Sequence, residues 1–433
     1  MELFFYNIFL LVFKAGVRIA GLFDGKAKKW VTGRKNIFEK LETAITANNK
    51  IIWIHCASLG EFEQGRPLLE ELRSRYKDYK LLLTFFSPSG YEIRKDYKGA
   101  DWVYYMPMDG VQNAKRFLNI VNPSLVIFVK YEFWYYYLKG VKQRNIPLLL
   151  VSALFREDSG YFKWYSGLQR KMLFFFQHLF VQTEASKKML ASIGINHNCS
   201  VSGDTRFDRV IEIAENSAAI PVIEQFIANR KTIVAGSTWP EDEDILQKTM
   251  QAISDPLLQL IIAPHEINKE HIAQLQRLFP EAVLYSQLLQ RSERTPLESP
   301  FGQHLNPEHP NSNILIIDNI GMLSRLYKYA YITYIGGGFG KGIHNTLEAA
   351  VYGKPVLFGT NYHKFNEAMD LINTGGAISI NNAEDGITTI KKLLQDEKLY
   401  LSSSESARKY VYANKGATEK IMKFIQENRL LTN

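Results

Sequence analysis

The chain has 433 residues, of which 46% are hydrophobic and 13% aromatic, and this composition excludes a disordered protein. One ordinary core does not reach this length, so we expect two domains. The net charge of +8 indicates an acidic partner, such as anionic lipid or a phosphorylated substrate. Because the basic residues are scattered, nucleic acid is not expected as a partner. With only Cys56 and Cys199, a disulfide framework is not expected either, and a reducing cytoplasm fits best.

The N-terminal segment, residues 3–23, is strongly apolar, although Asn7, Lys14 and Arg18 interrupt it. A helix that spans a bilayer needs about 20 mostly apolar residues, and the strongest run here is about half as long. Four basic residues follow, as expected for a cytoplasmic flank beside anionic lipid: Lys26, Lys28, Lys29 and Arg34. We therefore expect a membrane anchor over residues 1–30, either inserted in the interface or barely spanning. A helix packed on the protein itself is the alternative.

The rest of the chain repeats one pattern, in which short apolar runs end in Gly, Ser or Pro and helical stretches follow. The runs in the first half are residues 50–56, 81–86, 102–107, 124–130, 146–153 and 178–183. Those in the second half are residues 231–237, 258–265, 282–286, 313–318, 331–338 and 354–359. Continuous apolar runs separated by helices predict parallel strands covered on both faces.

This pattern predicts two doubly wound, Rossmann-like α/β domains that face a central cleft. We expect the first domain over residues 31–212, a linker over 213–230, and the second domain over 231–410. A C-terminal helix over 411–433 is expected to return to the first domain. Ligands of such sheets bind beyond the carboxyl ends of the strands, so each loop after a strand is a candidate site.

The strongest candidate is the stretch GGGFGKGIHNTLEAAVYG, residues 336–353, which follows a predicted strand. Glycines let a ligand approach the backbone, and a helix start offers free N–H groups to a phosphate. Glu348 falls near that helix start, where it could bind ribose hydroxyls or only complement the helix dipole. The spacing is neither G-x-G-x-x-G nor a P-loop, and a tight turn is the structural alternative.

Three more strand ends of the second half carry polar or backbone groups. Ser237 and Thr238 could bind a phosphate or cap the next helix, and we expect capping from at least one of them, with Pro240 in the first turn. His265 ends a third strand and points toward the expected cleft, although a lone His is more often structural. The loop around Gly321 offers backbone groups.

In the first half, Glu61 lies in the stretch HCASLGEFEQGRPLL. Ser58 and Glu61 have the spacing of a capping box, which would make Glu61 structural. Pro67 instead indicates that the regular helix starts later and leaves Glu61 in a loop, free for chemistry.

Two further charged residues follow strands of the first half. Glu132 comes directly after a predicted buried strand and lies among aromatics, where a carboxylate is costly unless it is paired. Arg206 could meet an anionic group, or form only a solvated salt bridge. No H-E-x-x-H, D-x-D or paired Cys motif is present, so no metal site is expected.

In order and spacing these motifs resemble the lipid A 3-deoxy-D-manno-octulosonic acid (Kdo) transferase family. The shared stretches cover nearly the whole chain: the apolar N-terminus, HCASLGEFEQGRPLL, YEFW, GDTRFD, AGSTWPEDE, APHE, DNIGML and GGGFGKGIHNTLEAAVYGKPVLFGTNYHKF. The resemblance implies a GT-B glycosyltransferase that moves Kdo from CMP-Kdo to a lipid A precursor with inversion, without a metal or other cofactor. It also implies a place on the cytoplasmic face of the bacterial inner membrane, whose anionic surface is a partner.

The resemblance also implies the roles of individual residues. Glu61 matches the general base, while Glu132 and Arg206 match residues that support the transition state. The expected donor-nucleotide contacts are Ser237, Pro264, His265, Ile320, Gly321, Met322, Lys341, Asn345, Thr346, Leu347 and Glu348.

Three departures from the family pattern affect how the donor phosphate is bound. Where the family has Pro-Arg-His, this chain has Pro264 and His265, so Lys341 or His265 is expected to replace the missing positive charge. The glycine-rich loop is about one residue shorter. Asp204 and Arg206 stand where Asn and Lys are commoner.

Two alternatives remain for the function. One is a GT-B transferase or epimerase that uses a UDP-sugar. The other is a non-catalytic, membrane-associated nucleotide-binding protein, which does not explain the two carboxylates in the first half.

Overall fold

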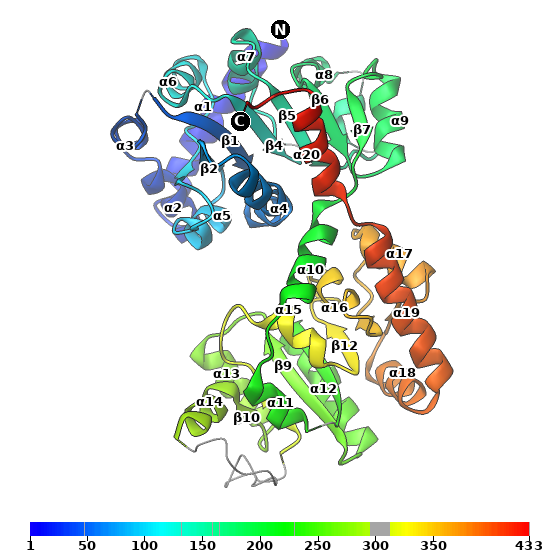
Figure 1. Ribbon diagram of the computed structural model, residues 1–433. Helices are drawn as coiled ribbons and strands as arrows, with labels where there is room; N and C mark the ends of the chain where they lie inside the picture. The colour runs from blue at the N-terminus through cyan, green and yellow to red at the C-terminus, as the bar shows by residue number, and fades with distance from the viewer. Residues whose placement is uncertain are drawn as a thin grey trace. The chain divides into compact units, whose positions relative to one another are not determined.

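The computed structural model describes residues 1–46, 48–130, 132–157, 159–163, 165–228, 230–294 and 312–432, with the side chains of residues 291–294 left out. It divides into two compact units, which Figure 1 labels by element. Unit 1 comprises Met1–Arg209 and Lys415–Asn433, and unit 2 comprises Val210–Asn414.

Unit 1 is built on a seven-stranded sheet in the order β3-β2-β1-β4-β5-β6-β7, and all its strand pairs are parallel. The strands are β1 Lys50–Cys56, β2 Tyr79–Phe85, β3 Trp102–Tyr105, β4 Leu125–Val129, β5 Leu148–Ala153, β6 His178–Val181 and β7 Cys199–Val201. The order reverses at β1 and β4, which is the topological switch point of a doubly wound sheet. The parallel sheet predicted for the first half is confirmed.

Helices cover both faces of this sheet. They are α1 Glu2–Ala20, α2 Gly25–Gly33, α3 Ile37–Ala44, α4 Leu59–Arg75, α5 Pro88–Arg94, α6 Val111–Val121, α7 Tyr135–Gln143, η1 Gly160–Phe162, α8 Gly167–Leu173, α9 Glu184–Ser192, the start of α10 Thr205–Asn216, and α20 Ala417–Glu427. Because neighbouring side chains of a strand point to opposite faces, Ile51 and Trp53 join one core while Ile52 and Ile54 join the other. Two buried faces explain why β1 is apolar without alternation.

Unit 2 is built on a second seven-stranded parallel sheet, in the order β10-β11-β9-β8-β12-β13-β14. Its strands are β8 Lys231–Thr238, β9 Leu258–Pro264, β10 Val283–Leu284, β11 Ile314–Ile316, β12 Ile332–Ile335, β13 Val356–Phe358 and β14 Ala377–Ser379. The order reverses at β9 and β8, so this unit is also doubly wound. The fold class predicted from the sequence is confirmed, but β14 was not expected. It has only three residues, of which only Ala377 is buried.

In unit 2, the helices that follow β11 and β12 are short. The helices of this unit are α11 Pro221–Ile227, α12 Pro240–Ile253, α13 Lys269–Leu278, α14 Tyr285–Arg294, α15 Leu323–Leu326, η2 Tyr327–Tyr329, α16 Leu347–Ala350, α17 Asn366–Asn373, α18 Ala383–Gln395 and α19 Glu397–Ala413. Residues 213–230 hold the end of α10 and the whole of α11, whose Ile223 is fully buried.

The apolar helix α1 packs on unit 1 through one face. Leu10 is buried, and the Phe13 ring lies 5.7 Å from the Trp30 ring of α2. Within the described ranges, α1 is the one helix that is long and apolar enough to cross a membrane. Arg34, which we expected in the basic flank, donates to three backbone carbonyl oxygens and stacks over the Trp30 ring. Aromatic rings therefore cover much of its guanidinium, whereas Lys26, Lys28 and Lys29 are exposed.

The C-terminal helix α20 packs against α4 of unit 1. Ile421, Met422 and Ile425 of α20 are buried in the same core as β1 and β2. The chain thus returns to unit 1 after completing unit 2.

We expect Ile421→Ala to destabilise unit 1 by about 2–5 kcal/mol, because it leaves a cavity in this core. Lys423→Ala, on the exposed side of the same helix, should change the stability by less than about 0.5 kcal/mol. Urea unfolding of the two variants, followed by tryptophan fluorescence, measures the difference. Equal stability of the two variants would show that α20 does not contribute to the fold of unit 1.

Candidate active site

Glu61 lies at the carboxyl end of β1, in the first turn of α4. The Ser58 hydroxyl donates a hydrogen bond to Glu61 Oε2, and Lys130 Nζ lies 3.6 Å from Glu61 Oε1. The Glu61 side chain is 17% exposed, so the carboxylate is held from two sides and still reaches solvent.

Two local expectations about Glu61 were wrong. Ser58 occupies the N-cap position, but its side chain makes no capping hydrogen bond, because the hydroxyl binds the Glu61 carboxylate instead. Pro67 does not delay the helix either, since α4 begins at Leu59 and runs through the proline. A proline removes one helical hydrogen bond, and the burial of Leu68 and Leu69 on the sheet keeps the helix intact.

Glu132 follows β4, the strand beside β1, and a buried chain of hydrogen bonds holds it. Trp53 Nε1 donates to Thr84 Oγ1 at 2.8 Å, Thr84 Oγ1 lies 2.9 Å from His55 Nδ1, and His55 Nε2 lies 2.8 Å from Glu132 Oε2. The hydroxyl of Thr84 accepts from Trp53, so it can donate to Nδ1 and leave His55 Nε2–H to donate to Glu132. The burial cost that we noted for Glu132 is thus offset by a partner on β1.

Arg206 is tied to the helix that carries Glu61. Its guanidinium binds Asp204 Oδ2 at 2.7 Å, and Gln64 Nε2 of α4 donates to both oxygens of Asp204 at 3.2 Å. Gln64 lies three residues after Glu61, so the two share one side of α4. The negative charge of Asp204, which stands where Asn is commoner in the family, is therefore neutralised by Arg206.

The residues that the sequence interpretation missed in unit 1 are His55 and Lys130. The sequence interpretation treated His55 only as part of an apolar strand. A buried polar residue in such a run needs a hydrogen-bond partner, so it is itself a signal of a polar site. Lys130 has a φ of +65°, a left-handed conformation that is uncommon outside glycine.

In unit 2, three rings from three different loops form a stack. The Trp239 ring lies 4.7 Å from the His265 ring, which lies 4.4 Å from the His344 ring. Trp239 Nε1 donates to His344 Nε2 at 3.2 Å, and Lys341 Nζ lies 5.4 Å from the centre of the Trp239 ring. Burial lowers the pKa of His344 to about 4, and it also lowers the pKa of His265. Both imidazoles are therefore uncharged at neutral pH.

The glycine-rich loop is held by tight backbone packing and by one buried carboxylate. A Cβ on Gly336 would lie 2.2 Å from the Ser237 oxygen, and one on Gly338 would lie 2.4 Å from the Gly359 nitrogen. Asp242 Oδ2 accepts from Gly337 N at 2.8 Å and from Trp239 N at 2.9 Å. The tight-turn interpretation is therefore correct for these glycines, and Asp242, which the sequence interpretation missed, fixes the loop.

Pro240 is the first residue of α12, as predicted, but neither Ser237 nor Thr238 caps that helix. Trp239 is the N-cap residue, and the Thr238 hydroxyl donates to Glu243 Oε1 at 2.9 Å. Ser237 has a φ of +54° and lies within β8, at the register shift between Gly236 and Thr238.

The other expected nucleotide contacts present mostly backbone atoms. Ile320 is 87% exposed, Gly321 has a φ of +95°, and the side chain of Met322 is buried. Thr346 and Leu347 are also buried, as is Pro264.

The helix expected after the glycine loop, α16, has only four residues, Leu347–Ala350, so its dipole offers little to a phosphate. Asn345 Nδ2 donates to Glu348 Oε1 at 3.0 Å. Across the described ranges, no cluster of three or more His, Cys, Asp or Glu could hold a metal ion.

Comparison with known proteins finds matches to one family. The profile described as 3-deoxy-D-manno-octulosonic-acid transferase (kdotransferase) matches residues 34–209, which contain Glu61, Glu132 and Arg206. The protein named 3-deoxy-D-manno-octulosonic acid transferase in Rickettsia felis is 26% identical over 398 residues, covering 89% of this chain and 81% of its own. Its namesake in Aquifex aeolicus is 26% identical over 352 residues, covering 80% and 87%.

Residues 34–209 thus match the Kdo transferase family model, and most of the chain is similar to proteins named Kdo transferases. The resemblance predicted from the motifs is confirmed, and with it the prediction that the protein is a glycosyltransferase. The fold also resembles that of the UDP-GlcNAc 2-epimerase of Neisseria meningitidis bound to UDP-GlcNAc. That likeness has a TM-score of 0.60 at 17% identity and covers 87% of this chain and all of the epimerase.

We expect the stability of unit 2 to fall as the pH falls from about 6.5 to 4, partly because of His344. Its folded-state pKa of about 4 lies below the usual 6.5, so the unfolded state takes up the proton first and is favoured in this range. His344 should account for about 1–2 kcal/mol of the loss between pH 7 and 4.5, since solvent screens the partly exposed imidazole, and His344→Gln should remove that part. Hydrogen exchange of peptides from β8, measured at both pH values, reports on this unit. An identical pH dependence in the wild type and the variant would contradict the assignment.

Proposed function

We propose that the protein transfers Kdo from CMP-Kdo to a lipid A precursor, with inversion, on the cytoplasmic face of the inner membrane. The observation that carries the proposal is Glu61, a carboxylate held by Ser58 and Lys130 at the switch point of unit 1 and still partly exposed. The family match and the names of the relatives support Kdo as the transferred sugar.

The reaction requires a base at the acceptor. Glu61 takes the proton of the acceptor hydroxyl as its oxygen forms a bond to the anomeric carbon of Kdo. The bond from that carbon to the phosphate oxygen of CMP breaks, and the oxygen leaves with the electron pair. Attack opposite the leaving group inverts the anomeric centre.

The neighbours of Glu61 prepare it for this step. Lys130 and Ser58 each contact one oxygen of the carboxylate and orient it, while the side chain stays exposed enough for an acceptor to reach it. His55 positions Glu132, whose carboxylate stabilises the positive charge that develops on the sugar in the transition state. The guanidinium of Arg206 stabilises the negative charge that develops on the leaving phosphate.

The donor binds through unit 2 in this proposal. The phosphate needs positive charge, and the family's Arg is absent. His265 does not replace it, because burial lowers its pKa and leaves the imidazole neutral. Lys341, exposed beside Trp239 at the end of the ring stack, is the cation that replaces it. Backbone groups around Gly321 and the side chains of Asn345 and Glu348 would hold the nucleoside.

A cavity of about 590 Å³ in unit 1 suits the lipid part of the acceptor. Its walls are mostly aromatic or aliphatic, and they come from α1, from the loop after β4, and from α8. Phe5 and Phe9 line it on the side of α1, and Glu132 lines it as well. An acyl chain in this cavity would therefore place the polar end of the acceptor near the carboxylates.

We expect Glu61→Gln to fold and to bind CMP, but to transfer sugar at least about 100-fold more slowly, because the base is lost. Glu63→Gln is the matched control: it removes the same charge from the same helix, where Glu63 pairs with Arg94 on the surface. The control should stay within about threefold of the wild type. Mass spectrometry of a lipid A precursor incubated with CMP-Kdo measures transfer, and near-normal turnover in Glu61→Gln would refute this role.

The alternative is an enzyme that uses a UDP-sugar, since the fold is shared with a UDP-GlcNAc 2-epimerase. We expect CMP to raise the melting temperature of the protein by several degrees at millimolar concentration, and UDP to raise it much less. The Lys341→Gln variant should lose most of the CMP effect. A larger shift with UDP than with CMP would favour the alternative.

A further inference from the structure

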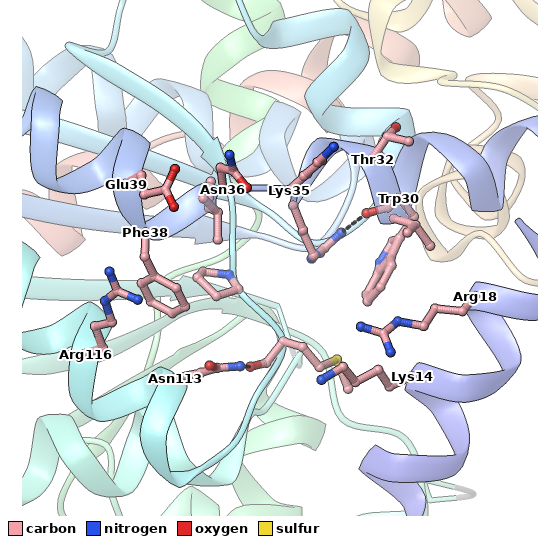
Figure 2. A pocket seen from close by; sticks show the side chains of 15 residues that line it. Lys14, Arg18, Trp30, Thr32, Lys35, Asn36, Phe38, Glu39, Asn113 and Arg116 are labelled. Atoms are coloured by element: carbon pink, nitrogen blue, oxygen red, sulfur yellow. Dashed lines mark hydrogen bonds between the residues drawn. The ribbon is translucent and has the colours of Figure 1, made fainter.

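A cavity of about 450 Å³ lies at the surface of unit 1 among α1, α2, α3 and the loop before α6. Figure 2 shows Lys14 and Arg18 reaching into it from α1, and Arg116 lying on the far side beside Phe38. Four exposed cationic side chains line this cavity against one carboxylate, that of Glu39; the four are Lys14, Arg18, Lys35 and Arg116.

The positive charge that is free to meet a ligand comes from three of these side chains. Arg34 also lines the cavity, but its guanidinium donates to three backbone carbonyl oxygens and lies over the Trp30 ring. Arg116 is already paired with Glu42 at 2.9 Å. By contrast, the side chains of Lys14, Arg18 and Lys35 have no ion pair or hydrogen bond within the described part of the chain. Lys14 and Arg18 are also four residues apart on one helix, a spacing at which like charges repel. Three uncompensated cations around one cavity fit an anionic ligand.

The helix that supplies two of these cations has two opposite faces. One face packs on the core of unit 1 at heptad spacing, through Leu3, Tyr6, Leu10, Phe13 and Val17. The other face exposes large apolar side chains along the whole helix, among them Phe4, Ile8, Leu11, Val12 and Ile19. Lys14 and Arg18 lie on the border between the two faces.

Polar contacts hold the first two turns of the packed face, and apolar packing continues as far as Val17. Glu2 accepts from the Gly167 backbone at 3.1 Å, the Tyr6 hydroxyl donates to Asp109 at 2.6 Å, and the Tyr136 hydroxyl donates to Asn7 at 2.7 Å. A helix fastened to a folded domain from its first turn to its last cannot cross a bilayer without taking that domain with it. Its exposed apolar face fits an interfacial helix, which buries one side to the depth of the headgroups and upper acyl chains.

We propose that α1 lies flat in one leaflet and that the cavity beside it binds the phosphate headgroup of an anionic phospholipid. The apolar face of α1 and the cationic cavity share one helix, so the face enters the acyl region while Lys14 and Arg18 meet the phosphates at its border. Lys35, in the turn between α2 and α3, completes the charge around the headgroup. The proposal rests on the membrane attachment of the proposed function, but not on the sugar transfer.

The binding site is tested with short-chain lipids that stay monomeric, since these detect a discrete site and not a charged surface. The full chain should bind dihexanoyl phosphatidylglycerol one to one in a calorimetric titration, and dihexanoyl phosphatidylcholine at least about tenfold more weakly. The double variant Arg18→Gln, Lys35→Gln should lose at least about tenfold in affinity for the anionic lipid. The control variant Lys28→Gln, Lys29→Gln removes the same charge from exposed positions of α2 that do not line the cavity, and it should stay within about threefold.

Three outcomes of this titration would overturn the lipid site. They are the absence of saturable binding, an equal loss in both double variants, and inorganic phosphate binding as tightly as the anionic lipid. No donor or acceptor sugar is present, so the result is independent of whether the protein transfers Kdo.

The orientation of α1 is tested with spin labels on Phe4→Cys, Leu11→Cys and Ile19→Cys, in vesicles of phosphatidylcholine and phosphatidylglycerol. Cys56 and Cys199 are buried, so labelling is confined to the introduced cysteines. A helix that lies flat places the three labels at similar depths. A spanning helix would place Leu11→Cys much deeper than the other two, and that profile would overturn the proposal.

Discussion

The parallel pairing of strands is the constraint on which the candidate site depends. When every strand of a sheet runs in one direction, the residues that follow the strands all emerge at the same edge. In unit 1 this brings Glu61, after β1, next to Lys130 and Glu132, after the adjacent β4, although some 70 residues separate them in the chain. In unit 2 the same constraint stacks Trp239, His265 and His344 from three separate loops. The chemistry of each unit is thus assembled by the direction of its strands.

Buried polar side chains then fix these loops in place. His55, inside β1, joins Thr84 of β2 to Glu132 after β4, so three neighbouring strands hold one carboxylate. Asp242 does the same in unit 2, where it binds the backbone of Gly337 and Trp239 and the Tyr334 hydroxyl. A buried polar group without its partner is costly, so such networks favour one loop conformation over others. This rigidity suits a catalytic or binding site, which must hold its groups before the ligand arrives.

The helix α1 has two apolar faces, and only one of them packs on the protein. Its packed face follows the heptad spacing of a helix in a protein core, and its opposite face is equally apolar but exposed. Composition alone describes both faces in the same way, which is why a spanning anchor, an interfacial anchor and a packed helix all remained open from the sequence. The polar contacts of Glu2, Tyr6 and Asn7 hold one face of α1 on unit 1, while its other face stays exposed.

The sequence by itself determined the fold class, the course of most strands and the family resemblance. Long apolar runs separated by helices have few other solutions, and motifs such as HCASLGEFEQGRPLL keep their order along the chain. Only the tertiary structure decided what the polar residues do: that Ser58 binds Glu61 and does not cap α4, that His55 supports Glu132, and that Arg34 is covered by aromatic rings. The reason is physical: strand and helix periodicity is a local property of the chain. The partner of a polar side chain is set by residues that are distant in sequence, and the fold alone brings them together.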